Sequence, residues 1–304
     1  MRIGIVGAGK VGVSVGKYFR DADASCLVGY YSRTYKSAEE GAAFTDTKAF
    51  SSLQELIMAS DTLLITTPDA EIGKVWDCIA EELKQIYATD NAVANQSKIV
   101  CHLSGSLSSE VFSKNNKLDF VHGCSMHPMY AFHDKFSAYQ QLHQSFFTLE
   151  GDAVAVEQMT NLLAKTGNSY AVISPEMKVK YHCAASLASN HVIGLLETSI
   201  TILKECGFSE VGAYEILAPL VKNNVENVFR HREDATLCGT ANALTGPIER
   251  NDMDTVKKHL EVLTVEEQQL YELLGMVLVK LSEQKHPDGD FVDMKDLLQN
   301  RKRL

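Results

Sequence analysis

A glycine-rich turn near the N-terminus is the first part of the sequence whose residue types and spacing could do chemistry. It follows a short apolar run, residues 2–6, and precedes a segment with helical periodicity. In that setting the first glycine permits a tight turn, the second lets backbone N–H groups approach a pyrophosphate, and the third allows close packing of helix on strand. An ordinary glycine turn is the alternative, but the context favours a dinucleotide site. The predicted cofactor-binding residues of the turn are Gly7, Ala8, Gly9, Lys10, Val11 and Gly12.

The stretch after the second apolar run indicates which nicotinamide dinucleotide is preferred. An NAD site usually carries Asp or Glu there, about 20 residues beyond the turn, to bind the ribose hydroxyls. Residues 31–36 contain no carboxylate. Ser32, Arg33 and Thr34, with Lys36 close by, offer hydroxyl groups and positive charge that suit a ribose 2′-phosphate. We therefore expect NADP; an Arg33 that simply faces solvent is the alternative.

A third apolar run, residues 62–65, ends in Thr66, Thr67 and Pro68. Ligands of open parallel sheets bind at the carboxyl ends of the strands. We therefore expect these three residues beside the cofactor. Pro68 and the following Asp69 fit equally well as a simple strand terminator.

Two later apolar runs end in polar clusters, one containing Ser104 and the other His127. If the strands are parallel, both clusters lie on the edge of the glycine turn, next to the nicotinamide. Hydride transfer to a carbonyl leaves an oxyanion that needs a proton, and histidine has the side-chain pKa nearest to neutral pH. We expect His127 to polarise and protonate the substrate and Ser104 to donate a second hydrogen bond. A core histidine and a turn-capping serine are the alternatives.

A helix expected to begin near Met177 carries His182, Ser186 and Asn190 four residues apart, and therefore on one face. The helix is otherwise apolar and rich in alanine, and polar side chains buried without partners are unfavourable. The polar stripe must face either a wet cleft or another helix. We expect Asn190 and His182 to belong to a catalytic cleft.

A glycine–proline break in the second half, residues 243–252, contains Thr245 and Arg250. An arginine on such a turn suits a substrate carboxylate, which it can bind through two parallel hydrogen bonds. We expect Thr245 and Arg250 to bind substrate. In the alternative reading, Thr245 and Asp252 cap helices and Arg250 pairs with a local acid.

Metal, hydrolase and phosphoryl-transfer chemistry find little support in the sequence. His122, Cys124, His127 and His133 lie close together, but on a strand His122 and Cys124 point to one face and His127 to the other. No GxSxG, HExxH or Walker sequence is present. We expect no metal site.

The pattern of the first half supplies a scaffold for these residues. Short β-branched runs alternate with helix-like segments, which is typical of a parallel sheet covered on both faces. The fold class is therefore α/β: a doubly wound Rossmann domain followed by an all-α C-terminal domain. The expected strands are 2–6, 26–31, 62–66, 98–102, 120–126, 145–149 and 169–173, and the expected helices are 11–19, 37–43, 52–58, 72–83 and 154–165.

A change in the sequence pattern indicates the domain boundary. The chain has 304 residues, long enough for two domains. Alternation stops after Ser174 and Pro175, and helix-period segments follow. We expect a dinucleotide-binding Rossmann domain over residues 1–173 and a helical substrate and dimerisation domain over 174–304. The long apolar helices of the second domain need more cover than one chain provides, so we expect a homodimer through it.

Composition limits the partners. The net charge of −10 argues against a surface for nucleic acid or anionic membranes. No segment approaches the roughly 18 apolar residues needed to cross a bilayer, and the N-terminus lacks a signal-peptide pattern. The seven cysteines form no CxxC pair and mostly lie in apolar runs. We expect a cytoplasmic protein with buried free thiols that binds a small anionic substrate.

Four segments carry a resemblance to a known family: residues 102–105, 127–129, 181–190 and 244–250. The sequence resembles the 6-phosphogluconate dehydrogenase-like superfamily and, more closely, a family of Rossmann-like proteins with an uncharacterised C-terminal helical domain, over residues 1 to about 265. Similar proteins are described as NADP oxidoreductases, sometimes deazaflavin-dependent or pyrroline-carboxylate-reductase-like. Some resemble an alternative kind of ketopantoate reductase, which implies a small branched 2-oxo acid as substrate.

The resemblance also implies roles for residues. In prephenate dehydrogenases a similar His-Pro dipeptide carries the histidine that contacts the reacting hydroxyl, and here that position is His127. Better-known ketopantoate reductases and 6-phosphogluconate dehydrogenases have a catalytic lysine four residues before the helix asparagine. Asn190 is retained, but Ser186 stands at the lysine position. Proton transfer is then expected from His127 first, and after it from His182 or Lys180.

Together these features predict an NADP-dependent oxidoreductase that transfers hydride from NADPH to a small carboxylate-bearing ketone or imine, such as ketopantoate. A non-catalytic NADP-binding sensor or scaffold protein is the alternative. The missing lysine favours that alternative, and the polar clusters at the strand ends oppose it.

Overall fold

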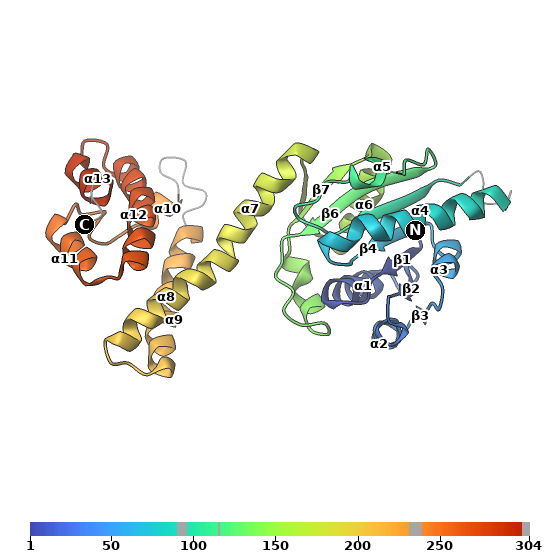
Figure 1. Ribbon diagram of the computed structural model, residues 1–304, viewed down its shortest axis with the longest axis horizontal. Helices are drawn as coiled ribbons and strands as arrows, with labels where there is room; N and C mark the ends of the chain where they lie inside the picture. The colour runs from blue at the N-terminus through green and yellow to red at the C-terminus, as the bar shows by residue number, and fades with distance from the viewer. Residues whose placement is uncertain (90–95, 115, 231–238, 300–304) are drawn as a thin grey trace. The chain divides into compact units, whose positions relative to one another are not determined.

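The computed structural model describes residues 1–89, 96–114, 116–230 and 239–299. The chain forms two compact units, Met1–His191 and Val192–Leu304. Figure 1 shows the helices and strands of both.

One sheet organises the first unit. In its described residues, eight strands lie in the order β3-β2-β1-β4-β5-β6-β7-β8. All neighbours pair in parallel except β6 and β7, which are antiparallel. Because β1, β4, β5 and β6 run the same way side by side, their carboxyl ends share one edge of the sheet. The strands are β1 (Ile3–Val6), β2 (Leu27–Tyr31), β3 (Lys48–Ala49), β4 (Thr62–Ile65), β5 (Lys98–His102), β6 (Val121–Pro128), β7 (Phe147–Gly151) and β8 (Tyr170–Val172).

Helices cover both faces of this sheet. Leu64 of β4 belongs to the core that α1, α2 and α6 form on one face, whereas Leu63 and Ile65 belong to the core that α3 and α4 form on the other. This alternation follows from the opposite directions of successive side chains on a strand. The helices are α1 (Lys10–Ala22), α2 (Tyr35–Thr45), α3 (Leu53–Ala59), α4 (Asp69–Thr89), α5 (Val111–Lys114), α6 (Ala153–Thr166) and α7 (Lys178–Ala188), with 3-10 turns η1 (Ala138–Gln144) and η2 (Pro175–Met177).

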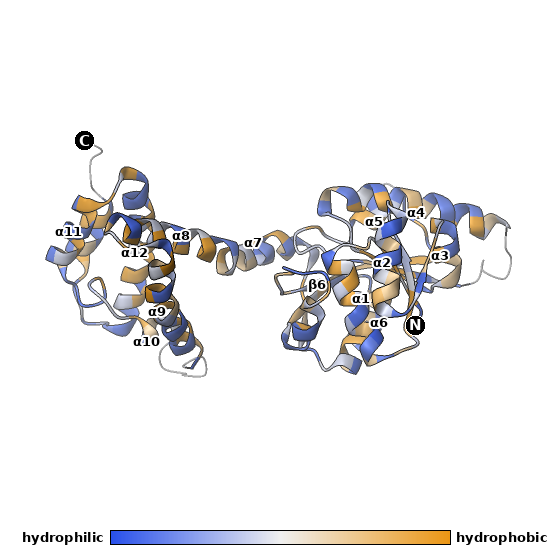
Figure 2. Cartoon of the chain, turned by 90° about the horizontal axis from the view of Figure 1, so that it is seen from below, coloured by the Kyte–Doolittle hydropathy of each residue, from blue (hydrophilic) through white to orange (hydrophobic). Residues whose placement is uncertain are grey.

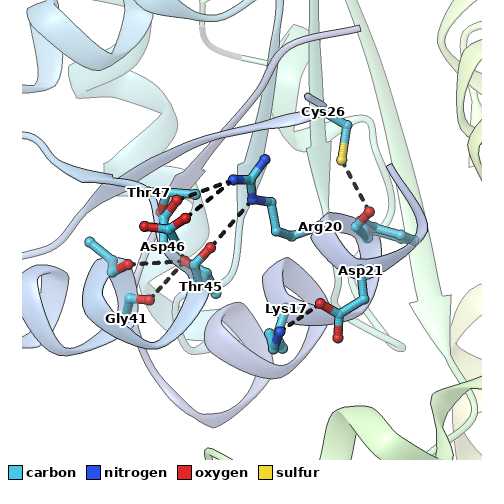
Figure 3. Close-up of polar contacts among 10 residues, drawn as sticks. Lys17, Arg20, Asp21, Cys26, Gly41, Thr45, Asp46 and Thr47 are labelled. Atoms are coloured by element: carbon cyan, nitrogen blue, oxygen red, sulfur yellow. Dashed lines mark hydrogen bonds and ion pairs between the residues drawn. The ribbon is translucent and has the colours of Figure 1, made fainter. Parts of the chain in front are cut away.

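Polar contacts hold α1, the helix that begins at the glycine turn, against the end of α2 (Figure 3). The Arg20 side chain donates from Nε to the carbonyl oxygen of Thr45 at 3.4 Å and from Nη2 to the carbonyl oxygen of Asp46 at 3.3 Å. The Thr45 hydroxyl donates to the carbonyl oxygen of Gly41 at 2.8 Å. These bonds satisfy carbonyl groups that the end of a helix leaves without partners, and they fix the axis of α1.

The second unit is helical throughout its described residues. Its own core contains Ile248, Val256, Leu260, Val279 and Met294, among other residues. No helix of the described chain combines the length and the apolarity needed to cross a bilayer. The helices are α8 (Asn190–Glu205), α9 (Glu210–Arg230), α10 (Gly239–Ala243), α11 (Met253–Val262), α12 (Val265–Lys285) and α13 (Val292–Gln299).

The predicted fold class, a doubly wound Rossmann domain followed by a helical region, is confirmed. Each of the expected strands corresponds to an observed one, including the two that extend the sheet beyond residue 145. The short strand β3 and the antiparallel direction of β7 were not predicted.

The prediction that one helix carries His182, Ser186 and Asn190 is wrong. Helix α7 ends at Ala188, and Asn190 begins α8. The Ser189 hydroxyl donates to the carbonyl oxygen of Ala185 at 2.8 Å, and Nδ1 of His191 lies 3.1 Å from the carbonyl oxygen of Ser186. Side chains thus contact the carbonyl groups of the last turn, and the helix breaks between the two segments.

The compact units divide after α7, whereas the sequence predicted a domain boundary at residue 173. Helix α7 stays with the first unit because the side chain of its first residue, Lys178, is 1% exposed and bonded to the sheet edge. The alternating sequence pattern stops where the helices begin, whereas the compact units divide one helix later.

Cysteines are less uniformly buried than the sequence indicates. Those in the described residues are all free thiols. Three of them lie in the core of the first unit, and three are exposed. The buried ones are Cys26, Cys101 and Cys124, and the exposed ones are Cys78, Cys183 and Cys206; Cys238 lies outside the described residues.

Candidate functional site

The glycine turn is tightly packed on its inner side. Gly7 has φ 109°, a left-handed conformation that favours glycine. The Thr66 hydroxyl donates to the carbonyl oxygen of Gly7 at 2.6 Å. A Cβ atom on Gly12 would lie 2.2 Å from that carbonyl oxygen. The first and third glycines therefore hold α1 close to β1 and β4.

The outer side of the turn opens into a cavity of about 560 Å³. Most of the predicted cofactor residues line it; Lys10, Val11 and Gly12 do not, because they begin α1 behind the turn. The predicted residues in the lining are Gly7, Ala8, Gly9, Ser32, Arg33, Thr34, Thr66, Thr67 and Pro68.

Four observations fit a dinucleotide in this cavity. The Thr67 hydroxyl is buried and has no hydrogen-bond partner in the described structure. A Cβ atom on Gly9 would meet nothing within 4 Å, so the backbone is open to a ligand there. Gly9 is also the N-cap of α1 and provides no side-chain cap, which leaves the first-turn N–H groups available to an anion. The exposed Arg33 side chain makes no hydrogen bond or ion pair among the described residues, so its charge is available too.

A second cluster forms around His127 of β6. Its Nδ1 atom lies 2.9 Å from the Tyr181 hydroxyl, and the two rings meet edge to face. The His182 ring also meets His127 edge to face, with centroids 5.9 Å apart. Gly105, in the turn after β5, allows this approach: a Cβ atom there would lie 2.8 Å from His127 Nε2 and 2.3 Å from His182 Cδ2.

The cluster borders a cavity of about 530 Å³. His127, Tyr181, His182, Ser186 and Asn190 line it, so the structure brings the predicted polar stripe to the predicted histidine despite the break between α7 and α8. The remaining lining residues are Met129, Tyr130, Ala131, Ala184, Ala185, Ala188 and Ser189. None of these residues is an acid, a lysine or an arginine.

His127 and Tyr181 are both held in their neutral forms. Burial, and after it the positive charge of Lys178, lower the pKa of His127 to about 4. Burial raises the pKa of Tyr181. At neutral pH the pair therefore consists of an uncharged imidazole and a protonated phenol, which share one hydrogen bond.

Ser104 has a different environment from the one expected of a substrate contact. Its hydroxyl donates to Asp69 Oδ2 at 2.6 Å and accepts the backbone N–H groups of Ser106 at 3.2 Å and Leu107 at 3.0 Å. The side chain is 5% exposed. A hydroxyl has one proton to donate, and here Asp69 accepts it. These contacts hold the turn after β5 against the start of α4.

Two residues of this region were missed in the sequence. Tyr181 precedes His182 and supplies the hydrogen bond to His127. Lys178 donates from Nζ to the carbonyl oxygen of Ser104 and to the hydroxyl of Ser125. The four-residue spacing that singled out His182 also includes Lys178, so a search of the same stripe one turn earlier could have found it. Lys180, a predicted proton source, is exposed and does not line the cavity.

Thr245 and Arg250 belong to the second unit. Thr245 lines an apolar cavity of about 410 Å³ within that unit, and Arg250 is exposed. The alternative reading of Asp252 as a helix cap agrees with its acceptance of the Thr255 N–H at 3.1 Å. Among the described residues, no three His, Cys, Asp or Glu side chains are grouped so as to hold a metal ion.

Comparison with known proteins supports the fold. Residues 1–119 match a Rossmann-like domain, and residues 145–277 match a domain of unknown function, DUF2520. No curated protein matches the chain.

Solved structures match over nearly the whole chain. A protein from Thermotoga maritima is 24% identical, with a TM-score of 0.68, over 93% of this chain and 99% of that one. Pyrroline carboxylate reductase from Plasmodium falciparum, solved with NADP bound, is 14% identical, with a TM-score of 0.59, over 94% and 96%. An imine reductase from Myxococcus stipitatus in complex with NADP+ is 14% identical, with a TM-score of 0.56, over 95% of each chain. The chain thus combines a Rossmann-like N-terminal domain with a DUF2520 C-terminal domain, in a fold that it shares with NADP-dependent reductases.

Proposed function

We propose that this protein is an NADP-dependent reductase that transfers hydride to a small carboxylate-bearing ketone or imine. One observation carries the proposal: a cavity that fits a dinucleotide and a neutral His127–Tyr181 pair lie at the same edge of one sheet, where the parallel strands β1, β4 and β6 end. Structural relatives with this fold bind NADP, which supports the choice of cofactor.

The residues that line the cavity at the glycine turn would each bind a different part of the cofactor. The glycine turn and the start of α1 hold the pyrophosphate, and Thr67 offers its unpaired hydroxyl. Ser32, Arg33 and Thr34 bind the 2′-phosphate. When bound, NADPH supplies the hydride.

The His127–Tyr181 pair supplies the proton. Tyr181 donates to Nδ1, which leaves the ring proton on Nε2, where it can polarise the carbonyl oxygen or imine nitrogen of a substrate in the adjoining cavity. As negative charge develops on that atom, the Nε2 proton passes to it and the Tyr181 proton passes to Nδ1. The pair is restored when Nε2 takes a proton from water and the proton on Nδ1 returns to the phenolate.

Recognition of the substrate involves the remaining predicted residues. Asn190 and His182 line the cavity and can orient the reacting group. The lining provides no lysine or arginine for a carboxylate; that Arg250 and Thr245 of the second unit bind the substrate stays a prediction. We keep the expectation of a small anionic substrate and of a cytoplasmic location.

Cofactor preference tests the assignment of Arg33. We expect Arg33→Ala to weaken NADPH binding by roughly tenfold to a hundredfold, because one charge-assisted hydrogen bond contributes about 1.5–3 kcal/mol. NADH binding should stay as it is, since NADH has no 2′-phosphate. Fluorescence titration with both nucleotides measures this. A variant that loses NADH and NADPH binding equally would contradict the assignment; Arg2→Ala, an exposed arginine before β1 that does not line the cavity, serves as the control.

Turnover tests the proton pair. With NADPH and a panel of 2-oxo acids and cyclic imines, we expect His127→Gln and Tyr181→Phe each to lower kcat by about 10²–10⁴, the range of general acid–base catalysis. NADPH binding should persist, and Arg250→Ala should raise KM for carboxylate-bearing substrates. If the unaltered protein binds NADPH but turns over no substrate in a broad panel, the sensor alternative holds instead.

The low pKa of the buried histidines predicts a pH dependence of stability. His102 and His127 both have pKa values of about 4 in the folded chain, against about 6.5 when unfolded. Between those values the unfolded state binds more protons, so the free energy of unfolding falls as pH drops from 6.5 towards 4, by at most about 1.4 kcal/mol per histidine per pH unit.

Urea unfolding followed by the fluorescence of Trp76, the one tryptophan and a buried residue of the first unit, measures this effect. His127→Gln should reduce the slope between pH 6.5 and 5, and His133→Gln, at an exposed position, should leave it unchanged. A slope that is the same in all three proteins would contradict the burial argument.

We also propose that a second copy of the chain covers the helical unit. Helices α8 and α9 expose Ile193, Val211, Leu220 and Phe229, at 66%, 68%, 55% and 62% of their surface, and apolar residues recur along both helices (Figure 2). Exposed apolar area of this kind marks an interface.

Light scattering should therefore give a mass of twice 33.5 kDa. Ile193→Asp combined with Phe229→Asp should yield monomers, because each places an unpaired charge in the apolar surface. Met58→Asp, at an exposed position of α3, is the matched control. A monomer mass for the unaltered chain would contradict the proposal.

A further inference from the structure

Lys178 is a buried lysine next to the proposed active site. Its side chain is 1% exposed, although it begins α7. Nζ donates to the carbonyl oxygen of Ser104 at 2.7 Å and to the hydroxyl of Ser125 at 2.8 Å. Burial of an ammonium group is unfavourable unless bonds replace its water, so both acceptors matter to the position of this side chain.

The two bonds connect α7 to two neighbouring strands. Ser104 follows β5, and Ser125 lies in β6 opposite His102 of β5. His127 comes two residues after Ser125. The lysine therefore bridges the ends of the strands that carry the Gly105 turn and the proposed proton donor.

The same face of α7 carries the partners of His127. Tyr181 and His182 follow Lys178 by three and four residues, a spacing that places all three on one face. Tyr181 bonds Nδ1 of His127, and His182 packs on its ring. If the first turn of α7 moved, both contacts with His127 would change together.

No carboxylate pairs directly with Lys178 among the described residues. Glu150 accepts the N–H of Ser109 at 2.8 Å and the hydroxyl of that serine at 2.7 Å, and Asp69 accepts the hydroxyl of Ser104. Both acids act on the lysine at longer range. Nζ is thus free to hold the backbone of the turn rather than to neutralise an acid.

We propose that Lys178 is a positioning residue that fixes α7 on the ends of β5 and β6, so that His127, Tyr181 and the Gly105 turn meet in reacting geometry. The inference rests on the proposed function for its kinetic effect, but the geometry is testable without turnover. Lys178 lies on the same stripe of α7 as Ser186, the position where the resembling enzymes carry their catalytic lysine, and two turns before it. Because it is buried, it acts through other residues and does not touch a substrate.

The test compares Lys178→Met with Lys98→Met. Lys98 is also a buried lysine, whose Nζ donates to the carbonyl oxygens of Ile57 and Ser60 at the other end of β5. Met keeps the length of either side chain and removes its charge and hydrogen bonds. The readout is the NMR titration of His127 in histidine-labelled protein, assigned by its loss in His127→Gln.

Lys178→Met should raise the pKa of His127 from about 4, and Lys98→Met should leave it unchanged. The charged or titratable groups that face His127 are Lys178, Tyr181 and His182 from α7 and Asp69 from α4. NADPH binding should be the same in both variants. Where turnover is present, kcat should fall about a hundredfold in Lys178→Met alone, as for a displacement of about 1 Å.

Ser125→Ala keeps the test decisive if Lys178→Met does not fold. It removes one acceptor of Nζ and should shift the His127 titration in the same direction by a smaller amount. The double variant Lys178→Met/Ser125→Ala should change the pKa of His127 and kcat no more than Lys178→Met alone does, because the two side chains act through one hydrogen bond.

The outcomes separate the two proposals. The role of Lys178 would be overturned if the pKa of His127 were unchanged in both Lys178→Met and Ser125→Ala. It would also be overturned if the effects of the two substitutions on that pKa added in the double variant. Absence of turnover together with the expected titration shifts would overturn the reductase function and leave the positioning role intact.

Discussion

The parallel pairing of β1, β4, β5 and β6 is the constraint on which the rest of the first unit depends. Ile65 of β4 lies opposite His102 of β5, and His102 lies opposite Ser125 of β6. Thr66, Ser104 and His127 each follow one of these paired residues by no more than two positions. Side chains far apart in the sequence therefore reach one edge, and a shift of β6 by one residue would turn His127 to the other face.

Residues near the strand ends could be predicted because this constraint is local in the sequence. An apolar run that stops at a glycine or at a polar cluster shows where a strand ends, and a parallel fold places all those ends together. The antiparallel β7 and the break at Ser189 could not be predicted in the same way. The first depends on the path of the chain between β6 and β7. The second depends on side chains of α7 and α8 that compete for carbonyl groups.

The contacts that complete the site could not be predicted from the periodicity of the sequence. Tyr181 and His127 are 54 residues apart, and Lys178 and Ser104 are 74 apart. Both contacts need the position of α7, and Gly105 leaves room in the turn after β5 for the rings of His127 and His182. Ser104 illustrates the converse: its position was predicted, but its hydroxyl is used by Asp69 and by two backbone N–H groups. Sequence position thus indicated proximity, and only the bonds distinguish a contact with substrate from support of a turn.

The absence of a lysine at position 186 changes the electrostatics of the cavity more than its shape. An ammonium group there would face the substrate and could donate a proton directly. With Ser186 in its place, the lining contains no acid, lysine or arginine, and the nearby positive charge is that of Lys178, which is 1% exposed and bonded to the strand ends. A cation in that position cannot transfer a proton to a substrate, but it favours the neutral form of His127. In the proposed mechanism two tasks are therefore divided: the buried cation orients the helix and the imidazole, and the uncharged His127–Tyr181 pair delivers the proton.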